Sequence, residues 1–187
     1  MNWLEWLIRA FHPGRDFSAQ HATRTMNLSI LEGGFSMLFI NWTQGSVLTG
    51  YALFLGATPL ELGLIASVPL LGQVLAPLIA WLAGRVGRRK SLTVATAVLG
   101  RVIWTVAALL PAIAPPDSRA GLLILTIAIS GIFLAGNGAL WTAWMGDVVP
   151  QEQRGRYFGL RGGVLGIVGM LANLAAGAFV DVVAAPL

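Results

Sequence analysis

Six polar side chains interrupt apolar stretches of this sequence, at positions where they could bind a small solute. They are Asn41, Gln44, Gln73, Arg101, Asn137 and Asn173. Amides and a guanidinium can hydrogen-bond a polar solute or hold an anion, but they do not form a catalytic group by themselves. The sequence offers no paired carboxylates, no histidine cluster and no nucleophile beside a base. It therefore predicts binding rather than catalysis, with no cofactor and no metal.

Most of these residues are predicted to lie near the centre of a membrane. At about 1.5 Å per residue from the presumed cytoplasmic ends, Gln73, Arg101 and Asn137 lie roughly 12–16 Å deep, with Asn41 and Asn173 near 20 Å. Transporters bind their substrates at that depth. The competing interpretation is that the amides join helices through hydrogen bonds, each contributing only about 0.6 kcal/mol.

Among these residues, Arg101 is the one for which a functional role is most strongly predicted. An arginine at the centre of a bilayer costs about 2.5–3.5 kcal/mol on insertion scales, so it needs a partner or a wet cavity. Glu32 is the nearest plausible carboxylate in the apolar segments. We expect Arg101 either to pair with Glu32 or to hold an anionic substrate.

Five long apolar segments carry these residues, at roughly 28–54, 60–83, 92–114, 121–146 and 160–184. Each has about twenty residues or more, enough for a helix to cross about 30 Å of hydrocarbon. The chain is 56% hydrophobic and 11% charged, with a mean hydropathy of +0.75. A soluble domain needs more polar surface. The predicted fold is an all-α, polytopic transmembrane helix bundle over 27–187, with Pro69 and Pro77 kinking the second segment.

The basic residues are grouped in short turns between the apolar segments, which favours lipid headgroups as their partners over nucleic acid. One group follows the second segment and another follows the fourth: Arg85, Arg88, Arg89 and Lys90, then Arg154 and Arg156. Positive residues are retained on the cytoplasmic side. The pattern predicts a multi-pass protein of the cell membrane, with its N-terminus in the cytoplasm.

The first 26 residues are predicted to form a cytoplasmic segment that lies on the membrane surface. Within residues 2–12, apolar side chains share one helical face and Glu5 and Arg9 lie opposite. Such a helix lies in the interface rather than crossing the bilayer.

The turn after the second segment carries a family resemblance. From Ala80 to Lys90 the sequence reads Ala-Trp-Leu-Ala-Gly-Arg-Val-Gly-Arg-Arg-Lys. It resembles the signature of the major facilitator superfamily (MFS) between helices two and three: glycine, three residues, Asp-Arg, any residue, glycine and two basic residues. Arg85, Gly87, Arg88 and Arg89 match, but Ala80 and Gly84 replace the first glycine and the aspartate. In the family that aspartate belongs to an ionic latch, and Asp147 is the candidate to substitute for it.

A second resemblance follows the fourth segment, where Asp147, Pro150 and Arg154-Gly155-Arg156 are similar to a turn of many bacterial members. The resemblance implies helices one to five of a twelve-helix transporter, in which two halves rock about a central site. It implies secondary active transport of a small solute by alternating access, with the missing C-terminal half as a partner in the same or another chain. It also favours a bacterial inner membrane.

Two alternatives remain open from the sequence. A truncated relative could serve as a membrane scaffold or accessory subunit without transport of its own. An intramembrane enzyme has the least support, for the reasons given above. The substrate and the coupling ion cannot be read from these residues, because one fold carries many solutes.

Overall fold

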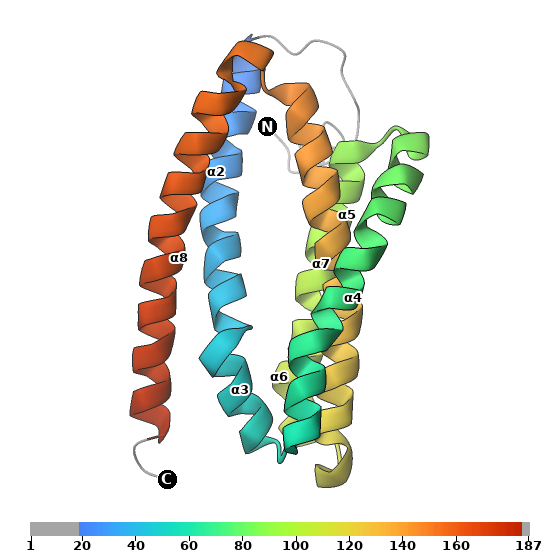
Figure 1. Ribbon diagram of the computed structural model, residues 1–187, viewed down its shortest axis with the longest axis vertical. Coiled ribbons are helices and arrows are strands. Elements are labelled where there is room, and N and C mark those ends of the chain that lie inside the picture. The colour runs from blue at the N-terminus through green and yellow to red at the C-terminus, as the bar shows by residue number, and fades with distance from the viewer. Residues whose placement is uncertain (1–18, 185–187) are drawn as a thin grey trace, which may run out of the picture. The chain divides into compact units, whose positions relative to one another are not determined.

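The structure is a computed structural model that describes residues 19–184, all of them in helices or short connections (Figure 1). Within these residues there is no strand, which confirms the all-α prediction; the interfacial helix predicted at 2–12 lies outside them. The elements are α2 (Ala19–Trp42), α3 (Gly45–Phe54), α4 (Pro59–Val86), α5 (Arg89–Val102), α6 (Trp104–Ile113), the 3₁₀ turn η1 (Pro116–Ser118), α7 (Arg119–Val148), the 3₁₀ turn η2 (Gln151–Gln153) and α8 (Arg154–Ala184).

Among the described residues, four helical stretches are long and apolar enough to cross a membrane, judged by length and composition. They are Pro59–Leu82, Arg89–Ile113, Pro116–Val148 and Gln151–Val182. They correspond to the last four predicted segments. The first predicted segment, 28–54, is divided between α2 and α3, so a fifth crossing stays a prediction.

The division of the first segment has a clear backbone cause. The amide of Thr43 donates both to Phe39 O and to Ile40 O, at 3.0 and 3.3 Å, as α2 ends. Gly45 then adopts a φ of +59°, a left-handed conformation that glycine reaches without steric cost. The α2 helix also begins at Ala19, nine residues before the predicted start. The single apolar segment predicted at 28–54 therefore contains a turn between two helices.

The α4 helix starts with a capping box. Thr58 precedes it, Pro59 is its first residue, and Glu61 Oε2 accepts from Thr58 N and Thr58 Oγ1 at 2.7 and 2.8 Å. Glu61 N donates back to Thr58 Oγ1 at 3.3 Å. These bonds satisfy amides that a helix start leaves free. The helix then continues through both internal prolines to Val86.

The described residues divide into two compact units. Unit 1 is Leu55–Asp147 and holds α4, α5, α6 and α7; unit 2 is residues 19–54 and 148–184 and holds α2, α3 and α8. In unit 2, α2 and α8 pack along their length (Figure 1). They run parallel, since Met26 contacts Tyr157 while Asn41 lies by Gly169.

Unit 1 is held by close approach of its helices at glycines. A β-carbon built at Gly72 of α4 would lie 2.6 Å from Gly131 O of α7, and one at Gly136 would lie 2.9 Å from Ile79 Cγ2. These pairs place α4 and α7 parallel. Small residues let helices approach closely in a membrane, where packing replaces the hydrophobic effect as the driving force.

Candidate functional site

The turn that carries the family signature is built around Gly87. This residue has a φ of +68° and separates α4 from α5. The chain reverses there in a conformation that side chains with a β-carbon avoid. Gly87 is therefore the residue at which the chain reverses between α4 and α5.

The turn is tied to the end of α7 by an ion pair. Arg89 Nη1 lies 2.6 Å from Asp147 Oδ2, and both side chains are partly exposed. The two residues are 58 positions apart in the sequence. A basic residue of the signature is thus bonded to the aspartate that the sequence proposed as a substitute for the missing one at Gly84.

The other basic residues of the two turns have different surroundings. Arg85 stacks over the ring of Trp81, with its guanidinium carbon 4.0 Å from the ring centroid. Arg154 Nε donates to Val149 O at 3.3 Å, which satisfies a carbonyl just beyond α7. Arg88 and Arg156 are exposed. The turns therefore combine one ion pair, one cation–π contact and one cap.

A polar seam joins α5 to α7 in unit 1. Ser130 Oγ donates to Gly100 O at 2.7 Å, and Asn137 Nδ2 donates to Thr93 O at 2.7 Å. Each helix contributes positions seven residues apart, in opposite order, so the helices are antiparallel and meet on one face. Asn137 Nδ2 also lies 3.4 Å from Thr96 Oγ1.

The seam shows what the Asn137 amide does within unit 1: it joins two helices. That observation favours the helix-joining interpretation for this residue. Its contact with a solute stays a prediction.

Arg101 occupies the last turn of α5, next to Gly100. Its Nη1 donates to Ala97 O at 3.4 Å, and the side chain is half-buried. The guanidinium therefore lies back along its own helix. Among the other predicted solute ligands in unit 1, Gln73 is exposed on α4.

In unit 2 the predicted ligands lie on α2, on α8 and at the break between α2 and α3. Asn41 Nδ2 donates to Met37 O at 2.8 Å and lies 3.7 Å from a β-carbon built at Gly169 of α8. Gln44, at the break between α2 and α3, and Asn173, on α8, are both exposed. Asn41 is thus packed at the α2–α8 contact.

Arg161 of α8 is a charged residue of unit 2 that the sequence argument did not assign to a site. Its guanidinium packs against α2, because a β-carbon at Gly33 would lie 2.7 Å from Arg161 Nη2. Glu32 is the carboxylate whose negative charge interacts with it. Ser36 Oγ donates to Glu32 Oε1 at 2.7 Å. The pairing predicted between Glu32 and Arg101 joins two different units and stays a prediction.

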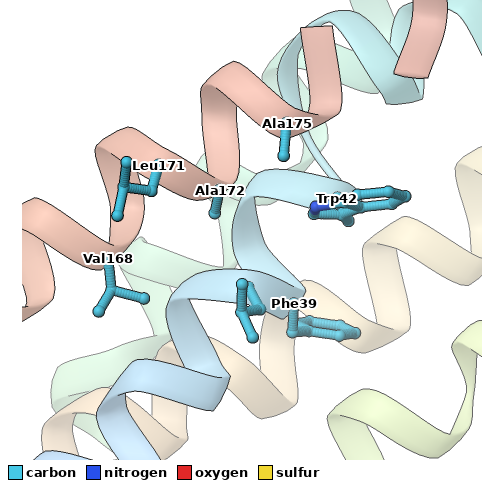
Figure 2. A pocket seen from close by; sticks show the side chains of 7 residues that line it. Phe39, Trp42, Val168, Leu171, Ala172 and Ala175 are labelled. Carbon is cyan, nitrogen blue, oxygen red and sulfur yellow. The ribbon is translucent and has the colours of Figure 1, made fainter. Parts of the chain in front are cut away.

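An apolar groove of about 710 Å³ lies between α2 and α8. Figure 2 shows the side chains that line it, which belong to Leu38, Phe39, Trp42, Val168, Leu171, Ala172 and Ala175. Solute sites place a few polar groups among apolar ones to orient the ligand. This groove is lined by hydrocarbon and one indole, so it does not provide the contacts that a polar solute needs.

Comparison with known proteins decides the family. The family model described as Major Facilitator Superfamily matches residues 31–185, most of the chain. The chain belongs to the Major Facilitator Superfamily. It is therefore a membrane transporter of the MFS kind. No curated protein and no solved structure matches it.

Membership in the superfamily agrees with the two sequence motifs, but sequence reasoning missed three residues that the structure places in contacts. Ser130 and Trp104 lie inside apolar segments, and Arg161 lies in α8 just beyond the second basic turn. The seven-residue spacing of Ser130 and Asn137 was the available signal for the seam. No spacing in the sequence pointed to Trp104.

Proposed function

We propose that this chain carries out secondary active transport of a small solute by alternating access, as the N-terminal part of an MFS transporter. The observation that carries the proposal is the 2.6 Å ion pair between Arg89 and Asp147. It links the signature turn to the end of α7, where the resemblance implies an ionic latch. We place this turn in the cytoplasm, together with the N-terminus.

An exposed ion pair suits a latch that must open in every transport cycle. Pairs in contact with water contribute only about 0–1 kcal/mol, because water and salt screen the charges. The Arg89 and Asp147 side chains are 39% and 60% exposed, so their pair belongs to this class. A small change in solute binding can then shift the balance between the open and closed states.

Arg101 is our leading candidate for solute contact, and the other polar residues named above remain candidates with it. A guanidinium in an apolar segment costs free energy unless it pairs with a negative charge or faces a water-filled cavity. We therefore expect the solute to carry a negative charge or a strong hydrogen-bond acceptor. The partners in this proposal are the lipid bilayer, the solute and a second transporter half.

Transport is tested with the complete coding region that contains these residues, expressed in cells and prepared as inside-out membrane vesicles. Sugars, amino acids, peptides and organic anions are added singly while a pH-sensitive dye reports the proton gradient and labelled solute reports uptake. We expect one class to accumulate, and a protonophore to abolish the accumulation. Membrane-inserted protein that moves no solute of any class contradicts the proposal and favours an accessory or scaffold role.

A further inference from the structure

The joint between α5 and α6 is held by a side chain from a third helix. The two helices are separated by Ile103, where Ile103 N donates to Leu99 O at 3.3 Å and Val106 N donates to Ile103 O at 3.1 Å. The second bond spans three residues instead of four, so the helix tightens there. Neither flanking residue is proline or glycine.

One hydroxyl group bridges the two sides of this joint. Ser130 Oγ donates to Gly100 O of α5 at 2.7 Å and accepts from Trp104 Nε1 of α6 at 2.9 Å. A serine hydroxyl can donate once and accept as well, so one atom serves both bonds. Ser130 is 2% exposed. Because little water can compete for bonds at a residue this buried, they fix both helix ends against α7.

The backbone at Gly100 has little room to move. A β-carbon there would lie 2.8 Å from Leu134 Cδ2, one turn beyond Ser130 on α7. The absence of a side chain lets α5 approach α7 closely enough for the Ser130 bond. Arg101 follows immediately, so its position is set by the same backbone.

We propose that Ser130 and Trp104 are positioning residues, which fix the α5–α6 joint and thereby set where the Arg101 guanidinium lies. The role of Arg101 in binding the solute rests on the proposed function; the joint itself does not. Loss of either side chain loosens the joint. The last turn of α5 then samples additional orientations, while the rest of α5 remains held at Thr93 by Asn137.

Spin-label distances across the joint test its rigidity. The chain contains no cysteine, so the pair Val94→Cys and Leu109→Cys carries the only two labels. Both positions are exposed, on α5 and α6, and fifteen residues of helix separate their backbones by about 22 Å. The protein is studied in nanodiscs of phosphatidylethanolamine and phosphatidylglycerol by double electron–electron resonance.

Ser130→Ala and Trp104→Phe are expected to add or enlarge a second distance population. Loss of one hydrogen bond within a membrane predicts that the ratio of the second distance population to the first rises roughly three- to eighteenfold. Thr126→Val is the matched control. Thr126 is also buried on α7, but its hydroxyl donates to Leu122 O of its own helix, at 2.8 Å, and not to a neighbouring helix. Its distance distribution should equal that of the parent.

The line shape of a spin label at Arg101→Cys tests the positioning role separately. We expect Ser130→Ala to mobilise this label and to leave a label at Val94→Cys unchanged. Equal mobilisation at both positions indicates general loosening and overturns the positioning role. Unchanged distances in both variants would show that these two side chains do not hold the joint. If Ser130→Ala does not fold, the distances in Trp104→Phe alone decide this point. A negative transport assay with an intact joint overturns only the proposed function.

Discussion

Gly72 of α4 and Gly131 of α7 approach so closely that a β-carbon at position 72 would stand 2.6 Å from the Gly131 carbonyl oxygen. The obstacle is backbone, which cannot turn aside as a flexible side chain can. A β-carbon at Gly131 would in turn lie 3.5 Å from Pro69 Cα. The crossing of α4 and α7 in unit 1 therefore depends on the absence of a side chain at position 72.

Gly72→Ala is expected to lower the free energy of unfolding by about 1–3 kcal/mol, the usual cost of overpacking, because the two helices must separate. Thermal unfolding in detergent micelles measures the change. Gly63→Ala on the same helix is the control, since a β-carbon there meets nothing within 4 Å. Equal effects of the two substitutions would contradict the close crossing.

Asn137→Leu removes the bond from α7 to Thr93 O in the seam. We expect a loss of about 0.6 kcal/mol, with an upper limit near 1.7, because hydrogen bonds between membrane helices are modest. Thr142→Val serves for comparison, because that hydroxyl donates to Gly138 O of its own helix at 2.9 Å. A seam that contributes nothing would leave the two variants equally stable.

Gly87→Ala is expected to cost about 1–2 kcal/mol, since a residue with a β-carbon must adopt the left-handed conformation of this turn. The φ of Gly87 is +68°. Gly84→Ala, inside α4 and with open space around it, should be neutral or mildly stabilising. Unfolding midpoints of the two purified variants provide the comparison. Tolerance of alanine at both positions would show that the turn does not need glycine.

Glu32 and Arg161 are expected to be energetically coupled. A double-mutant cycle with Glu32→Gln and Arg161→Gln should give an interaction energy of about 0.5 kcal/mol or more, as for residues that share a charge network. The same cycle with Arg101→Gln tests the pairing predicted from the sequence. Coupling in the second cycle and none in the first would assign Glu32 to Arg101.

The sequence predicted helix type, four of the spanning stretches and the signature turn because these follow from long apolar runs and fixed motifs. It did not predict the breaks at Thr43 and Ile103, because each lies inside one long segment that is apolar on average. A polar Thr-Gln-Gly run was the only sign of the first break. The second has no local sign, since it is stabilised by Ser130 of a helix distant in sequence.

The candidate site was less predictable than the fold. Depth counting identifies polar residues in apolar segments, but not the atoms to which they bond. Asn137 and Ser130 both bond carbonyls of α5, yet only the asparagine stood out in the sequence. Serine is small and common in membrane helices, so its role depends on the neighbouring helix rather than on local composition.

The central claim, that an ion pair at the signature turn controls transport, is tested most directly by exchanging its charges. Solute uptake is measured in vesicles with Arg89→Asp, with Asp147→Arg and with both substitutions together. We expect each single change to reduce uptake by up to about fivefold, which corresponds to roughly 1 kcal/mol in the rate-limiting barrier, and the double change to restore a substantial part of it. Uptake that is unaffected by either single substitution, in protein inserted at normal levels, would contradict the claim.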